Sequence, residues 1–144
     1  MSKNNIYKAD AIMVRGLQFV GHAVQSGIAI VLDGVEEYGG LESGIRPMEC
    51  LLISLASCTG MDVISILRKK RQEVSEFRVK VEGVRAKEPP RRYEQIRLHY
   101  IVRGPDVSEQ AVARSIELSQ TKYCGVTASL NSEIEYEYTV ESES

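Results

Sequence analysis

Cys58 lies in the least polar stretch of the chain, ECLLISLASCTGMD at residues 49–62. A cysteine in such a stretch is either a small buried hydrophobic residue or a nucleophile, because the thiolate is the reactive form of the side chain. Small residues surround Cys58, alanine and serine before it and threonine and glycine after it. Small neighbours let a ligand or a second backbone approach a helix closely, so both interpretations of Cys58 stay open.

Cys124 follows a lysine and a tyrosine and comes directly before Gly125. Glycine suits a helix interior poorly, so we predict a helix break directly after Cys124. A positive charge or a helix N-terminus beside a thiol lowers its pKa and makes it more nucleophilic. The 66 positions that separate Cys58 from Cys124 (124 − 58) do not connect them, so a functional thiol pair and two structural cysteines both remain open.

The sequence supports a third reactive cysteine, a zinc site or a hydrolase-type catalytic site less well. Cys50 precedes Cys58 by eight positions, or about 80° around a helix, so we interpret it as a packing residue. The sequence has no CxxC motif, and His22 and His99 lie far apart, so no zinc site is predicted. No serine–histidine–aspartate or paired-carboxylate constellation stands out.

A helix over residues 47–71 must position Cys58. Pro47 suits its first turn, and the residues that follow leave little polar surface. A helix that is apolar nearly all round is either buried or membrane-spanning. Glu49, Gly60 and Asp62 interrupt the apolar run, so we predict a central core helix and no membrane association. One domain of this size has little material to cover such a helix, which favours an oligomer.

The remaining pattern predicts a single α+β domain over residues 1–144, with mostly antiparallel strands. Residues 11–23 are extended in character and form a hairpin with residues 28–34. Residues 77–81 and 96–102 alternate with period 2 and form a second hairpin. Asp106 or Ser108 caps a second helix, a short helix follows over residues 126–131, and residues 134–140 form the last strand.

Composition places the chain among globular proteins, with 43% hydrophobic and 26% charged residues. A net charge of −2 gives no general attraction for nucleic acid. The first residues have no apolar signal segment, and three cysteines are an odd, low number. We therefore expect a cytoplasmic protein, in a compartment where structural disulfides are rare.

Three motifs together resemble the OsmC/Ohr family of thiol peroxidases, the organic hydroperoxide resistance and osmotically inducible proteins. They are Arg-Pro-Met-Glu49, Ala-Ser-Cys58-Thr-Gly-Met-Asp-Val and Thr-Lys-Tyr-Cys124-Gly-Val. The YhfA-like branch is most similar, with its P-M-E opening, C-x-x-x-D-V helix and K-Y-C second site. The resemblance covers residues 15–140, and the order of elements also matches.

The resemblance implies an intertwined homodimer with OsmC-like folds, shared active sites at the interface and the long helix buried against its mate. Cys58 would be the peroxidatic cysteine and Cys124 the resolving cysteine. The substrate would be an organic hydroperoxide, and an external dithiol would reduce the resulting disulfide. No metal or organic cofactor is needed.

The chain departs from the family pattern around the reactive cysteine. Typical peroxidase members have a glutamate ten residues before it, where this chain has Met48, and Glu49 is one residue out of register. Typical members also hold the thiolate with an arginine from the N-terminal hairpin loop, and residues 21–27 contain none. Arg15 and Arg46 are candidates for that role.

Asp62, one helical turn beyond Cys58, is a possible supporting residue whose charge would raise the pKa of the thiol rather than lower it. These departures leave a second hypothesis beside the peroxidase. It is a binding or redox-sensing dimer on the same scaffold, with weak or no peroxidase activity.

Overall fold

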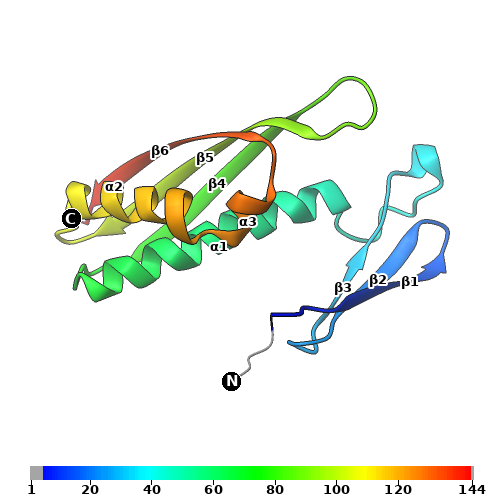
Figure 1. Cartoon of the computed structure of the whole chain (residues 1–144), viewed down its shortest axis with the longest axis horizontal. Helices are drawn as coiled ribbons and strands as arrows, with labels where there is room; N and C mark the ends of the chain where they lie inside the picture. The colour runs from blue at the N-terminus through cyan, green and yellow to red at the C-terminus, as the bar shows by residue number, and fades with distance from the viewer. Residues whose placement is uncertain (1–4, 144) are drawn as a thin grey trace. The chain divides into compact units, whose positions relative to one another are not determined.

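The computed structural model of the chain describes residues 5–143 (Figure 1). The chain forms two compact units, the first ending at Leu51 and the second beginning at Leu52. The interpretation of residues 1–144 as one domain therefore stays a prediction.

The first unit carries a three-stranded antiparallel sheet in the order β1-β2-β3, formed by Ala9–Arg15, Gln18–Ala23 and Ala29–Leu32. The predicted hairpin across residues 25–27 is confirmed as β2 and β3. The single extended segment predicted over residues 11–23 is wrong, because a turn at Gly16 divides it. Gly16 has a φ of 52°, and a Cβ there would lie 3.1 Å from the Gly39 carbonyl oxygen. Glycine tolerates both the conformation and the close approach.

Asp33 organises the loop that joins this sheet to the long helix. The loop contains a short 3₁₀ helix, η1 at Glu36–Tyr38. The Asp33 residue is 2% exposed, and its carboxylate accepts hydrogen bonds from the backbone of Gly34, Leu41 and Ser43 and from the Ser43 hydroxyl at 2.6 Å. The Ser43 hydroxyl is the largest influence on Asp33, and these bonds lower its pKa to about 2.

The predicted long helix is confirmed as α1, Pro47–Lys69. It begins with half of a capping box, because the Glu49 side chain accepts the Arg46 backbone N–H at 3.1 Å. It ends in a Schellman motif, in which Gln72 N–H bonds the Leu67 carbonyl and Arg71 N–H bonds the Arg68 carbonyl. Arg71 holds the left-handed position of this motif, with a φ of 59°.

Burial of α1 is less complete than the sequence predicts. One stripe at i, i+4 spacing is buried, namely Leu55, Thr59, Val63 and Leu67. Ile53 and Met61 on other sides are 54% and 68% exposed. By length and composition alone, α1 could also cross a membrane. Its buried stripe faces the second sheet of the same chain, where Thr59 contacts Tyr100.

The second unit is built on a sheet in the order β4-β5-β6, formed by Glu76–Arg85, Tyr93–Gly104 and Glu133–Ser142. The predicted hairpin is confirmed as the antiparallel pair β4 and β5. The β6 strand runs parallel to β5, so the sheet is mixed. The inward side chains of β5 are fully buried: Ile96, Leu98, Tyr100 and Val102.

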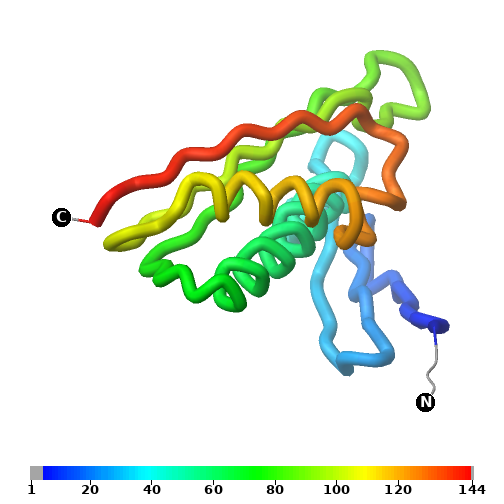
Figure 2. Tube along the Cα trace, turned by 60° about the vertical axis from the view of Figure 1, so that its left-hand side comes forward, coloured from blue at the N-terminus to red at the C-terminus, as the bar shows by residue number. Residues whose placement is uncertain are grey.

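A helical crossover joins β5 to β6. Helix α2, Glu109–Leu118, continues directly into a π-helical turn, η2 at Ser119–Tyr123, and the short helix α3 follows at Gly125–Ser129. Ser108 is the cap of α2, since its hydroxyl accepts the Ala111 N–H, so the alternative cap at Asp106 is wrong. Helices α1 and α2 lie side by side along one face of the sheet (Figure 2). This arrangement brings the middle of α1 beside the π-helical turn.

Candidate functional site

The second unit brings Cys58 and Cys124 together. Cys58 lies in the middle of α1 and is partly buried, while Cys124 ends the π-helical turn and is 3% exposed. Both are free thiols, and Cys124 is among the groups that raise the pKa of the Cys58 thiol, so the two side chains lie close together. The two sulfur atoms are therefore neighbours although 66 positions separate the residues (124 − 58).

Both thiols use the first turn of α3. Cys124 is the N-cap of this helix, and its sulfur accepts the Thr127 N–H at 3.4 Å. The backbone of Val126 in the same turn lies close enough to Cys58 to lower the pKa of its thiol. The first N–H groups of a helix have no partner inside it, so they are available to the sulfur atoms. The predicted break after Cys124 is confirmed, with α3 beginning one residue earlier than predicted.

The surroundings of Cys58 favour its protonated form. Burial is the largest cause that raises the pKa of this thiol, and the hydrogen bond and charge of Cys124 and the charge of Asp62 also raise it. The backbone of Val126 acts in the opposite direction. The expected influence of Asp62 is confirmed in direction. Among the described residues, none of these principal influences comes from a lysine or an arginine.

A buried polar cluster lies beside the thiols. The Thr59 hydroxyl is 2.7 Å from the Tyr100 hydroxyl and 2.7 Å from the Ser119 hydroxyl, and all three residues are fully buried. Ser119 donates to Asp62 Oδ2 at 2.9 Å. These contacts join α1, β5 and the π-helical turn through side chains, in a part of the core that is otherwise apolar.

Gln120 extends this cluster toward Cys124. Its Nε2 atom donates to Thr59 Oγ1 at 3.0 Å and to Tyr100 Oη at 3.2 Å. Its Oε1 atom accepts the Thr127 hydroxyl at 3.2 Å, and Thr127 N–H bonds the Cys124 sulfur. Burial raises the pKa of Tyr100 to about 12, so its phenol remains a neutral donor. We call the set of Thr59, Asp62, Tyr100, Ser119, Gln120 and Thr127 the polar network.

The other predicted support residues lie in the first unit. Glu49 accepts the Arg46 backbone N–H and so caps the start of α1, a role that the sequence analysis did not assign. Arg15 is exposed at the end of β1, where it pairs in register with Gln18. Contributions of Arg15, Arg46 and Glu49 to the thiols stay predictions. Among residues 5–143 no cluster of three or more histidine, cysteine or acidic side chains could hold a metal ion.

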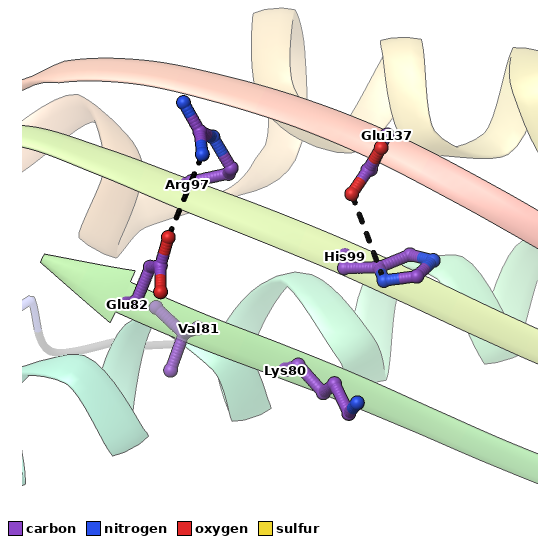
Figure 3. A pocket seen from close by; sticks show the side chains of 6 residues that line it. All are labelled: Lys80, Val81, Glu82, Arg97, His99 and Glu137. Atoms are coloured by element: carbon purple, nitrogen blue, oxygen red, sulfur yellow. Dashed lines mark ion pairs between the residues drawn. The ribbon is translucent and has the colours of Figure 1, made fainter.

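A hollow of about 390 Å³ on the outer face of the second sheet is lined by charged side chains (Figure 3). Arg97 forms ion pairs with Glu82 at 3.6 Å and with Glu135 at 3.7 Å. His99 Nδ1 lies 3.7 Å from Glu137, and its Nε2 lies 2.8 Å from the Thr139 hydroxyl. These groups are paired on an exposed face, and we assign the hollow no part in the site.

Sequence reasoning missed most of the polar network. The period-2 alternation over residues 96–102 predicts that every second side chain faces the core, which includes Tyr100, but it does not single out Thr59, Ser119 or Gln120. Thr59 could have been found from its position in the i, i+4 stripe between Leu55 and Val63, since a polar residue there must find a partner. No local signal identified Ser119 or Gln120.

The fold and the matched sequence define the class of this protein. A model of the family described as OsmC-like protein matches residues 40–139, which include both thiols and the whole polar network. The chain therefore belongs to the OsmC-like family, and the resemblance seen in its motifs is confirmed.

Individual relatives place the chain within that family. It is 38% identical over 128 residues to Protein YhfA of Escherichia coli K12, covering 89% of this chain and 92% of that protein. The structure of a hypothetical protein from Aquifex aeolicus VF5 superposes with a TM-score of 0.85 at 31% identity, covering 98% and 100% of the two chains. An organic hydroperoxide resistance protein, OsmC, from Legionella pneumophila shares the fold at a TM-score of 0.69 and 11% identity, covering 99% and 100%.

Proposed function

We propose that the protein is a thiol-dependent peroxidase that reduces organic hydroperoxides. The observation that carries this proposal is the proximity of two free thiols, Cys58 and Cys124, at the first turn of α3. A pair of neighbouring thiols can pass through a disulfide without a metal or an organic cofactor. Membership of the OsmC-like family, which includes proteins described as organic hydroperoxide resistance proteins, supports the choice of substrate.

The reaction proceeds in three balanced steps. The Cys58 thiolate attacks the O–O bond of the hydroperoxide; one oxygen becomes the Cys58 sulfenic acid, and the other leaves as an alcohol after taking up a proton. The Cys124 thiol then attacks that sulfur, and a disulfide and water are formed. An external dithiol reduces the disulfide by exchange and is itself oxidised to a disulfide.

We also propose that the protein acts as a homodimer. Ile53 and Met61 of α1 are largely exposed in one chain, and they line an apolar hollow of about 450 Å³ together with Phe77 and Val79 of β4. The first unit likewise exposes apolar side chains of its sheet, including Ile12, Met13 and Ile30. Exposed apolar surface of this kind is typical of an interface between chains.

The second candidate function is binding or redox sensing with little peroxidase turnover. The raised pKa of the Cys58 thiol favours it, since a peroxidase needs a thiolate at neutral pH. Met48, where typical peroxidase members have glutamate, also favours it.

Intact-mass analysis after addition of one equivalent of cumene hydroperoxide separates the two candidates. A peroxidase is expected to lose 2 hydrogen atoms per chain as the Cys58–Cys124 disulfide forms, and to consume peroxide continuously when dithiothreitol is added. Cys58→Ser should abolish consumption, whereas the matched change Cys50→Ser should leave it unchanged. Unreacted thiols in the wild-type protein, with no turnover under several dithiols, would reject the peroxidase.

A further inference from the structure

The polar network has one consistent arrangement of hydrogens. The Asp62 carboxylate accepts and cannot donate, so Ser119 donates its only hydroxyl hydrogen to it. Ser119 must then accept the hydrogen of Thr59 across their 2.7 Å contact, and Thr59 must accept the hydrogen of Tyr100. A single carboxylate on α1 thus orients three buried hydroxyl groups in sequence.

Gln120 completes this arrangement without leaving a donor unused. Its two Nε2 hydrogens point to the second lone pair of Thr59 and to the oxygen of Tyr100, at 3.0 and 3.2 Å. Thr59 then donates once and accepts twice, which is the full capacity of a hydroxyl group. Fully satisfied buried networks of this kind rigidify the elements that they join, because any displacement leaves a buried polar group without a partner.

The element held in this way is the π-helical turn that carries Cys124. Ser119 and Gln120 fix the start of the turn to α1 and β5 through their side chains. The Ser119 carbonyl accepts the Cys124 N–H at 2.8 Å, and Thr127, bonded to Gln120, supplies its N–H to the Cys124 sulfur. Displacement of Ser119 or Gln120 would therefore displace the Cys124 thiol relative to Cys58.

We propose that Asp62, Tyr100 and Gln120 are positioning residues that hold Cys124 beside Cys58 and thereby set the rate at which the disulfide closes. In the peroxidase reaction, on which this statement of the role rests, the Cys124 thiol attacks the Cys58 sulfenic acid and water leaves. The same geometry governs closure from any activated form of Cys58, because the attacking thiol is the same.

Asp62 acts on Cys58 through its charge as well as on Ser119 through its hydrogen bond, and two substitutions can separate these effects. Its negative charge lies near Cys58 and disfavours the thiolate. Asp62→Ala removes both this charge and the acceptor of Ser119, whereas Asp62→Asn removes the charge and keeps an amide oxygen as acceptor. Both variants should speed alkylation of Cys58 by iodoacetamide at pH 7.5, but only Asp62→Ala should slow closure of the disulfide. A loss of stability alone would not make both variants alkylate faster while only Asp62→Ala closes the disulfide more slowly.

Closure is measured without peroxide, in a Cys50→Ser background. Treatment with 5,5′-dithiobis(2-nitrobenzoic acid) converts the Cys58 thiol to a mixed disulfide and releases one nitrothiobenzoate. The Cys124 thiol then displaces the second nitrothiobenzoate as the Cys58–Cys124 disulfide forms, and the first-order rate of this release reports closure. Cys124→Ser removes the second release and identifies it.

Tyr100→Phe and Asp62→Ala should slow the second release roughly tenfold or more, since a small displacement of a reacting group has large kinetic effects. Asp62→Asn should stay within about twofold of the background protein on the same argument. Tyr138→Phe, at a position of β6 that is 38% exposed and outside the polar network, is the matched control and should be unchanged. If Tyr100→Phe does not fold, as judged by circular dichroism, Gln120→Met in the partly buried position takes its place.

Equal release rates in all folded variants would overturn the positioning role, whatever the peroxide assay shows. A slowed second release in a protein that consumes no peroxide would support the positioning role and reject the peroxidase. The two proposals therefore fail separately.

Discussion

Cys58 is a thiol whose reactivity is opposed by its immediate neighbours. Burial, Cys124 and Asp62 all raise its pKa, and the Val126 backbone opposes them. In the proposed reaction Cys124 attacks the oxidised Cys58, and the proximity of the two side chains suits that step. The surroundings of Cys58 therefore favour closure of a disulfide more than ionisation of the resting thiol.

The pH dependence of alkylation tests this view of Cys58. In a protein with Cys50 and Cys124 replaced by serine, the remaining influences of burial and Asp62 still raise the pKa. The rate of iodoacetamide modification should therefore rise with pH and reach half its maximum above the midpoint measured for a cysteine in a model peptide. A midpoint below that of the peptide would show that a cation, such as Arg15 or Arg46, acts on Cys58 in the assembled protein.

Asp33 leads to a prediction about stability at low pH. Its pKa is lowered to about 2 from 3.8, so it stabilises the fold fully above pH 4, and the stabilisation is lost as the pH falls through about 2. Asp33→Asn should lower the Tm at pH 7, and the difference from wild type should shrink as the pH falls from 4 toward 2. Asp106→Asn, at an exposed position, is the control and should leave the Tm unchanged at each pH. A constant difference for Asp33→Asn down to pH 2 would contradict the assignment.

The helical crossover from β5 to β6 carries much of the candidate site. Helix α2 ends at Leu118, and the π-helical turn that continues it carries the polar network residues Ser119 and Gln120. Cys124 follows the turn as the N-cap of α3. π-helical turns are rare and are often found at functional sites, because they shift the direction of one side chain relative to a regular helix.

The cap of α2 can be tested independently of the thiols. Ser108→Ala removes the acceptor of the Ala111 N–H and should lower the free energy of unfolding by about 1 kcal/mol, measured by urea denaturation. Asp106→Ala removes the alternative cap suggested by the sequence and should have little effect. A larger loss for Asp106→Ala than for Ser108→Ala would contradict the observed cap.

The two hairpins and the central helix could be predicted from the sequence because period-2 and helical patterns are local. The direction of β6 could not, since alternation such as Ile134, Tyr136 and Tyr138 is the same in a parallel and an antiparallel strand. The turn at Gly16 was missed because the residues on both sides of it favour strands.

The candidate site could be predicted only in part. Cys58 and Cys124 were identified by family motifs, and their contact depends on the path of α2 and its π-helical turn, which no local pattern encodes. Thr59 and Ser119 resemble ordinary small residues in the sequence. Their importance comes from partners 41 and 60 positions away.

At the scale of the whole molecule, the exposed apolar residues of α1 predict a dimer. Light scattering should give a mass of about twice the 16.1 kDa of one chain. Met61→Asp places a charge on the exposed side of α1 and should shift the protein toward the monomer. Val84→Asp, at an exposed position of β4 that does not line the apolar hollow formed by α1 and β4, is the matched control. A monomeric wild-type protein would contradict this prediction.

The end of α1 offers a direct route to a more heat-resistant protein. Arg71 occupies a left-handed position that glycine fills at most such helix ends, and it is exposed. A side chain in this conformation costs about 1 kcal/mol, so the native sequence gives up stability at a site remote from the thiols. Arg71→Gly would recover part of that loss, and a protein stabilised in this way could better tolerate further destabilising substitutions elsewhere in the chain.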